Sequence, residues 1–247
     1  MRVAICISGQ PRDVNVGVEQ VLSQIIKANP SVDFDVFAHA WIAESGEAWD
    51  TAQPHQSFAV GKQEADAQKT ILSKLNPKLW LFEPQICFDN FTNGFNSHPT
   101  AKQTSLASNF YSVYMANNLK KQYEVMNGFV YNNVLRMRYD LWFNKPVILS
   151  EYQDYTQDHV VVPKNYQEDQ DRILWNVKNK GMVDVFAISS SKNMDKYSET
   201  FLQMPAINKI HSPPFGEVYL GVNARIIQGL ALYLADIDLD LIRRKTV

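Results

Sequence analysis

NNVLRMRYDLWF, residues 132–143, is an apolar, strand-like run interrupted by two arginines and one aspartate. Desolvating arginine or aspartate is costly, so these side chains seldom lie in an apolar strand without partners. In a continuous strand, alternation places Arg136, Arg138 and Asp140 on one face. Such a charged stripe at the end of a buried strand is typical of a ligand site in an open α/β sheet, where a phosphate-rich ligand binds. An internal ion pair that only fixes the strand explains it equally well.

The segments around this stretch predict an α/β fold. Val3–Ile7 is a short apolar strand, broken at once by a loop that contains Pro11. Apolar residues at helical spacing follow from Val14 to Ile25, and a second strand is expected from Asp35. This order of strand, helix and strand predicts a mostly parallel central sheet with helices on both faces.

The rest of the chain predicts a single domain, residues 1–247. A largely buried helix is expected over 105–123, strands over 160–162 and 183–189, and a last helix over 218–235. With 247 residues and 45% hydrophobic content, the chain can bury one substantial core.

Composition excludes several classes of protein. The chain has 24 basic and 26 acidic residues without a polybasic run, which argues against general nucleic-acid binding. Cys6 and Cys87 are too few for a disulfide framework or a zinc site. No apolar stretch reaches the roughly 18 residues of a membrane span. We therefore expect a cytoplasmic protein without an integral membrane segment.

The loop Ser8-Gly9-Gln10-Pro11-Arg12 follows the first strand, where a parallel sheet faces its ligand crevice. Ser8 and Gln10 can hydrogen-bond a base or ribose, and Arg12 can bind a phosphate. The alternative is a proline-containing turn with an exposed arginine. The loop has neither the Gly-Lys-Ser/Thr ending of a P-loop nor a GxGxxG pattern, which argues against ATPases and NAD enzymes.

Four further residues are candidates for function, and three of them also have an ordinary interpretation. Trp41 can stack on a base, or it can belong to the core or a lid. His211 and Glu217 flank a turn-rich loop and can supply a metal ligand or a general base near Asp140. A surface histidine and a helix N-terminal glutamate are the alternatives. Asp184 directly precedes a buried strand and is more suggestive of function than the acidic cluster of Glu168, Asp169 and Asp171, which is more simply read as solvated.

Taken in order, these segments resemble the GT-A type of nucleotide-sugar-dependent glycosyltransferase, especially a bacterial and viral group that begins with Ser-Gly-Gln-x-Arg. The resemblance rests on residues 5–12, 35–41, 136–140 and 184–189, and on Glu217. It implies a GT-A, Rossmann-like architecture in which residues 1–145 bind the nucleotide and residues 146–247 form the acceptor side. The nucleotide sugar would then contact Ser8, Gly9, Gln10, Arg12, Trp41, Arg136 and Arg138.

The resemblance also implies a cofactor, Mn²⁺ or Mg²⁺, that bridges the diphosphate. Asp140 corresponds to the carboxylate that binds it, and His211 to a further ligand. This sequence departs from the usual Asp-x-Asp pattern because Arg138 replaces the first carboxylate. An arginine there can itself neutralise part of the diphosphate charge.

The function implied is transfer of a sugar from a nucleoside-diphosphate sugar to a hydroxyl of a glycan or small-molecule acceptor. Asp184 and Glu217 would lie on the sugar and acceptor side as catalytic carboxylates. The single carboxylate of Arg-x-Arg-x-Asp favours an alternative, a non-catalytic nucleotide-sugar-binding or assembly protein. A sugar nucleotidyltransferase ranks third, because the first loop has one glycine and no lysine.

Overall fold

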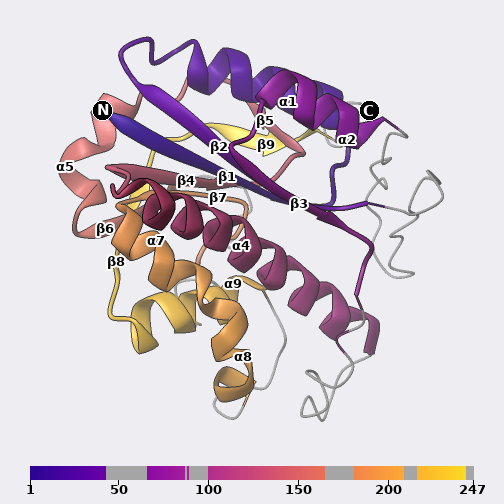
Figure 1. The fold of residues 1–247 in the computed structure, drawn as a ribbon. Coiled ribbons are helices and arrows are strands. Elements are labelled where there is room, and N and C mark those ends of the chain that lie inside the picture. Colours follow the sequence, from indigo (N-terminus) through magenta and orange to yellow (C-terminus); the bar gives the residue numbers. More distant parts are fainter. Residues whose placement is uncertain (43–65, 87, 89–99, 165–180, 209–215, 243–247) are drawn as a thin grey trace.

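The computed structural model describes residues 1–42, 66–86, 88, 100–164 (100–105 by backbone only), 181–208 and 216–242. Seven strands form one central sheet in the order β3-β2-β1-β4-β7-β6-β8 (Figure 1). They are β1 (Arg2–Gly9), β2 (Asp33–Trp41), β3 (Leu79–Glu83), β4 (Asn133–Met137), β6 (His159–Pro163), β7 (Phe186–Ser189) and β8 (Ala231–Ala235). The predicted α/β class with a mostly parallel sheet is confirmed.

Strand directions bring distant segments of the chain to one edge of the sheet. Strand β1 pairs in parallel with β2 and β4, and β2 pairs in parallel with β3. Strand β7 is antiparallel to both of its neighbours, β4 and β6. The carboxyl ends of β1 to β4 therefore lie at the same edge as the beginning of β7. Ligands of open α/β sheets bind at this edge.

Helices cover both faces of the sheet (Figure 1). On one face lie α1 (Val14–Gln20) with its helical continuation η1 (Val21–Ile26), and α2 (Ala67–Thr70) with η2 (Ile71–Leu75). On the other lie α4 (Thr100–Asn127), α7 (Ser191–Ser198), α8 (Thr200–Asn208) and α9 (Gly216–Gly221) with η4 (Val222–Ile227). Segments η3 (Leu149–Tyr152) and α5 (Gln153–Thr156) precede β6, and β5 (Leu141–Phe143) pairs with β9 (Leu239–Leu241).

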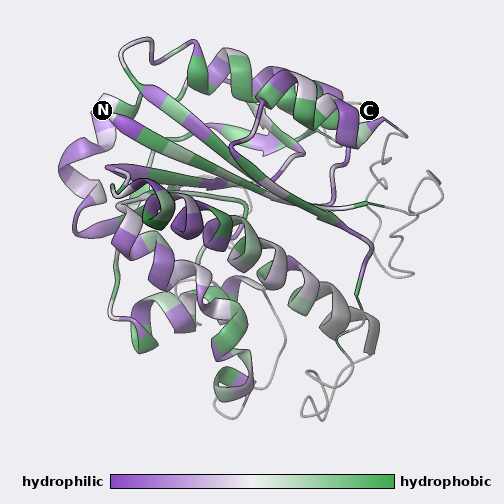
Figure 2. Ribbon diagram, in the orientation of Figure 1, coloured by the Kyte–Doolittle hydropathy of each residue, from purple (hydrophilic) through white to green (hydrophobic). Residues whose placement is uncertain are grey.

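Each face of the sheet has its own apolar core. Ile5, Val18 and Leu135 belong to the core on the α1 side, whereas Cys6, Val134 and Phe110 belong to the core on the α4 side. This division follows from strand alternation, which sends neighbouring side chains to opposite faces. Figure 2 shows hydrophobic residues along the central strands, between the two helical layers.

The charged stripe does not lie along one strand as alternation predicted. Strand β4 ends at Met137, and Arg138–Asp140 form the turn that leads into β5. Helix α1 packs directly against this turn, since a Cβ at Gly17 would lie 1.7 Å from the carbonyl oxygen of Tyr139. The turn is thus fixed by tertiary contact, and only Arg136 of the three charged residues belongs to the strand.

The predicted last helix, residues 218–235, is wrong beyond Ile227. Helical structure ends there, Gly229 takes the left-handed value φ = +66°, and Ala231–Ala235 form β8 in parallel with β6. Glycine tolerates this φ because it has no Cβ. The apolar residues that suggested a helix face instead complete the sheet.

The sheet runs through both halves of the chain, because β1–β4 precede residue 146 and β6–β8 follow it. The division into a nucleotide-binding half, 1–145, and an acceptor-side half, 146–247, stays a prediction. Across the described ranges, every helix falls short of the length or the apolarity that crossing a membrane requires.

Candidate active site

The first loop leaves β1 at the carboxyl edge of the sheet. Gly9 has φ = +114°, a value that side chains with a Cβ rarely adopt, and Asp13 at the start of α1 has φ = +47°. The Arg12 guanidinium donates a hydrogen bond to the Gln10 side-chain oxygen. Ser8 is buried, and its hydroxyl has no hydrogen-bond partner in the described part of the chain. Ser8, Gly9, Gln10 and Arg12 are thus all placed at this edge.

Arg138 and Asp140 form a two-point ion pair in the turn after β4. Arg138 Nε lies 2.8 Å from Asp140 Oδ1, and Arg138 Nη2 lies 2.7 Å from Asp140 Oδ2. The aspartate is almost fully buried, at 1% exposure. Its backbone oxygen also accepts a hydrogen bond from the Ile242 amide at 3.0 Å. The pair therefore matches the ion-pair interpretation of the stripe for these two residues.

This arrangement does not fit a resident divalent cation. Each Asp140 oxygen already accepts a hydrogen bond from the Arg138 guanidinium, and this cation beside the carboxylate disfavours a second cation there. Among the described residues, no three His, Cys, Asp or Glu side chains lie close enough together to hold a metal. His211, the second predicted ligand, lies outside the described residues. The expected Mn²⁺ or Mg²⁺ remains a prediction.

Arg136 is a buried cation without an ion pair. Its exposure is 2%, and its Nη1 donates to the backbone oxygen of Asp184. No carboxylate lies within ion-pair distance, and Nε has no hydrogen-bond partner, in the chain as far as the structure describes it. Burial lowers the pKa of Arg136 from its ordinary value. The carboxylates of Asp184 and Asp140 oppose this shift without forming an ion pair with Arg136, and a buried cation that lacks a direct ion pair favours an anion beside it.

Asp184 and the start of α9 meet beside Arg136. Asn109 Nδ2 lies 3.4 Å from Asp184 Oδ2, and a Cβ at Gly216 would lie 3.0 Å from the same oxygen. The Met182 amide donates to the Glu217 backbone oxygen at 2.9 Å. The two predicted catalytic residues, Asp184 and Glu217, are 33 positions apart in the sequence but belong to neighbouring segments of the fold.

Trp41 lies inside the protein at 2% exposure. Tyr111 stacks on its ring with centroids 5.4 Å apart, and the His39 ring meets it edge-on at 4.8 Å. These contacts match the core interpretation of Trp41, but its indole Nε1 is buried without a hydrogen-bond partner in the described residues.

Sequence reasoning missed a polar network next to Trp41. His39 Nδ1 lies 2.6 Å from Ser112 Oγ, and His39 Nε2 lies 2.9 Å from Glu83 Oε1. The Tyr111 hydroxyl also hydrogen-bonds to Glu83. Glu83 is the last residue of β3, so a carboxylate directly after an apolar run was the available signal. The histidine and serine partners come from β2 and α4 and have no sequence signature.

Buried polar atoms without partners gather at this part of the fold. Within the described ranges they include Ser8 Oγ on β1, Trp41 Nε1 on β2, Arg136 Nε on β4 and the Tyr197 hydroxyl on α7. Strand register and the α4-side core place these residues on the same face of the sheet. Because buried polar groups are normally hydrogen-bonded, their grouping indicates a place where a polar ligand or ordered water completes the structure.

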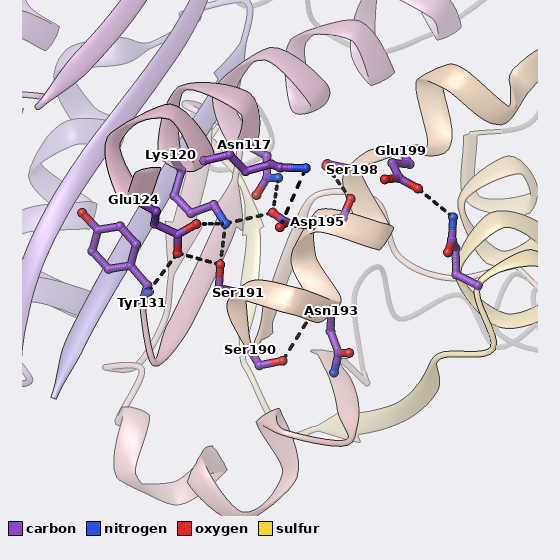
Figure 3. A network of polar contacts seen from close by, with 12 residues as sticks. Asn117, Lys120, Glu124, Tyr131, Ser190, Ser191, Asn193, Asp195, Ser198 and Glu199 are labelled. Atoms are coloured by element: carbon purple, nitrogen blue, oxygen red, sulfur yellow. Dashed lines mark hydrogen bonds and ion pairs between the residues drawn. The ribbon is translucent and has the colours of Figure 1, made fainter. Parts of the chain in front are cut away.

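A second polar cluster, in contrast, is internally paired (Figure 3). Lys120 Nζ lies 2.9 Å from Glu124 Oε2 and 2.8 Å from Asp195 Oδ1. Glu124 Oε1 accepts hydrogen bonds from Ser191 Oγ at 2.7 Å and from the Tyr131 amide at 2.9 Å. With charges balanced by direct contacts, this cluster joins α4 to α7 and offers little to a ligand.

Comparison with known proteins gives fold likeness only. No protein-family model matches the chain, and no curated protein matches its sequence. Among solved structures, mouse xyloside xylosyltransferase 1 in its apo form aligns with a TM-score of 0.48 and 9% identity, covering 95% of this chain and 84% of that one. The galactosyltransferase LgtC, in complex with donor and acceptor sugar analogs, aligns with a TM-score of 0.44 and 8% identity, covering 94% and 73%. The chemistry of this chain must rest on its own residues.

Proposed function

We propose that this protein is a glycosyltransferase that moves a sugar from a nucleoside-diphosphate sugar to a hydroxyl of a glycan or small-molecule acceptor. The observation that carries the proposal is Arg136, a buried guanidinium without an ion pair, at the carboxyl edge of a parallel sheet. An anionic ligand would supply the missing charge, and a diphosphate also offers acceptors for neighbouring donors. The resemblance of the sequence motifs to GT-A glycosyltransferases supports the choice of a nucleotide sugar.

In this proposal three arginines meet the diphosphate. Arg136 approaches from β4, Arg138 from the turn that follows, and Arg12 from the loop after β1. Arginine suits this role because its planar fork of donors matches phosphate oxygens. Arg138 already holds Asp140, which fixes the direction of the guanidinium.

The transfer step breaks the bond between the anomeric carbon and the diphosphate oxygen, and forms a bond from that carbon to the acceptor oxygen. The diphosphate leaves with the electron pair, and the arginines stabilise the charge that develops on it. The acceptor hydroxyl loses its proton to a carboxylate, for which Asp184 or Glu217 is the candidate. Asn109 supports Asp184 in this role through its contact with Oδ2. No step depends on a metal ion.

A binding titration tests the proposal. The unfolding midpoint would be measured with UDP, GDP, CDP, ADP and TDP and their common sugar conjugates, each with and without Mn²⁺. We expect one nucleotide to stabilise the protein by about 2.7 kcal/mol at a hundredfold excess over its dissociation constant. We expect the same shift without Mn²⁺, since arginines carry the charge. If no nucleotide shifts the midpoint, the proposal is overturned. If the shift requires Mn²⁺, a metal ion rather than the arginines neutralises the diphosphate.

Arg136→Met sharpens this test. Methionine has a similar length without the charge, so nucleotide affinity should fall by about tenfold to a hundredfold. Stability without ligand should change little, because the removed charge has no carboxylate partner. Lys121→Met, on the exposed side of α4, serves as the control that leaves binding unchanged. A large loss of stability with unaltered nucleotide affinity would make Arg136 a structural residue.

A non-catalytic nucleotide-sugar-binding protein is the second candidate. The paired state of Asp140 favours it, because this carboxylate is occupied by Arg138. Both candidates predict binding in the titration, but only the transferase releases free nucleotide from the sugar conjugate that binds. Mass-spectrometric detection of that nucleotide, with water or an added acceptor, separates the two.

A further inference from the structure

Glu83 is a carboxylate that the fold holds in place at the ligand-binding edge. It ends β3, and its backbone oxygen accepts the Ile42 amide at 2.9 Å, which fixes the chain there. His39 Nε2 and the Tyr111 hydroxyl both hydrogen-bond to its side chain. The side chain nevertheless keeps 24% of its surface exposed, while His39 behind it is fully buried.

The partners of His39 define the proton positions. Burial lowers the pKa of His39, so the neutral ring is favoured despite the nearby carboxylate. A carboxylate only accepts hydrogen bonds, so the proton lies on Nε2 and points to Glu83. Nδ1 then accepts the Ser112 hydroxyl. His39 and Tyr111 thus both donate to Glu83 from inside the protein, while part of the carboxylate surface faces solvent.

The network lies near the loop after β1, whose Arg12 belongs to the proposed diphosphate site. Two inter-strand steps, about 10 Å, separate β3 from β1, and the register sets Glu83 beside Trp41 and Gly9 beside Ala40. Glu83 and Arg12 thus both lie at the carboxyl edge of the sheet. Between them, on β1 and β2, lie Ser8 Oγ and Trp41 Nε1, two buried polar atoms without partners in the described residues.

We infer that Glu83 recognises the ribose of the nucleotide by accepting hydrogen bonds from its two adjacent hydroxyls. A carboxylate with two oxygens matches a vicinal diol, and acidic residues at the carboxyl ends of parallel strands read ribose in this way in other α/β proteins. His39, Tyr111 and Ser112 are positioning residues, since they contact Glu83 or its partner. The inference rests on the proposed nucleotide-binding function and adds a preference for ribonucleotides.

The test compares ribonucleotide and deoxyribonucleotide affinities within each variant. Calorimetric titration would use the diphosphate that binds the wild type, with its 2′-deoxy and 3′-deoxy forms. We expect the wild type to bind the ribonucleotide at least about tenfold more tightly. In Glu83→Gln this ratio should fall below about threefold, because the amide is a weaker, uncharged acceptor. A ratio taken within one variant cancels any general loss of folded protein.

Glu19→Gln is the matched control, since Glu19 is an exposed carboxylate on α1 that forms an ion pair with Lys74. It should keep the wild-type ratio. Equal affinities for ribo- and deoxyribonucleotides in the wild type would overturn this inference and leave the proposed function standing. An unchanged ratio in Glu83→Gln, or a change in base preference alone, would also overturn it. Failure of every nucleotide to bind the wild type would overturn both.

Discussion

At the scale of single residues, His39 makes stability depend on pH. Its ring is fully buried between Ser112 and Glu83, and burial lowers its pKa below the ordinary value of 6.5. The unfolded chain therefore binds a proton near pH 6.5 that the folded chain does not bind until lower pH. Where the unfolded state binds more protons, stability rises with pH. The stability that the neutral His39 contributes is thus fully present above about pH 6.5, and it is lost as pH falls toward the pKa of His39 in the folded protein.

We predict that His39→Gln flattens this dependence between pH 7 and pH 5. Glutamine keeps a donor toward Glu83 but does not titrate, so the histidine contribution to the slope disappears. Urea unfolding at several pH values measures the slope for both proteins. A slope as steep in the variant as in the wild type would assign the pH dependence to other groups.

Sequence showed the charged residues of the site but not their partners. Arg136, Arg138 and Asp140 are conspicuous because charge is rare in an apolar run. Arg138 pairs with Asp140 because β4 ends at Met137 and both residues lie in the turn that follows. The close packing of Gly17 against Tyr139 holds this turn in place, and the sequence carries no sign of that contact. Glu83 looked like an ordinary end-of-strand residue, because its partners His39 and Tyr111 lie 44 and 28 positions away along the chain, beyond the reach of any local pattern.

At the scale of elements, Lys120 joins α4 to α7. It is fully buried between Glu124 on its own helix and Asp195 on α7. We predict that Lys120→Met lowers the free energy of unfolding by roughly 3 kcal/mol, because two carboxylates lose their buried cation. Lys121→Met is the control: this side chain is 45% exposed and lies 3.9 Å from Asp195, so its removal should cost less than about 0.5 kcal/mol. Denaturant unfolding measures both free energies. Equal losses in the two variants would show that Lys120 does not stabilise the contact between α4 and α7.

Helix α1 sets the position of the turn that carries Arg138 and Asp140. A Cβ at Gly17 would meet the Tyr139 oxygen at 1.7 Å, so helix and turn must separate to admit alanine. We predict that Gly17→Ala lowers the free energy of unfolding by about 3 kcal/mol or more and weakens nucleotide binding. Gly128→Ala is the comparison, because Gly128 has φ = +68° but open space around it. It should cost only about 1–2 kcal/mol. Similar free energies of unfolding for the two variants would show that the turn at Tyr139 moves away from α1 at little cost, contrary to this prediction.

Helices and strands were predictable where the hydrophobic period was clear, as in β1, α1 and α4. The segment after Ile227 was not, because Leu230 and Leu234 suit a helix face as well as a strand. A left-handed glycine at 229 and pairing with β6 decide between them, and pairing partners distant in sequence leave no local signal.

At the scale of the whole molecule, one sheet holds the site together. The loop after β1 and strand β4 come from residues 1–145, whereas Asp184, Tyr197 and Gly216 come from the second half. Strand β7 connects the two halves of the sheet, since it pairs with β4 on one side and with β6 on the other. The expected assignment of the nucleotide to the first half alone is therefore open to a direct experiment.

We predict that a fragment of residues 1–145 neither unfolds cooperatively nor binds nucleotide. Without β7 the buried strand β4 becomes a sheet edge, and its backbone groups lose their partners. Arg136 also loses the Asp184 oxygen, and α4 loses the cover of α7 and α8. Thermal unfolding followed by circular dichroism checks the first part, and calorimetric titration the second. Co-expression with residues 146–247 should restore both properties, which controls for the quality of the fragment. A sharp transition and wild-type affinity in the fragment alone would make residues 1–145 an independent nucleotide-binding domain.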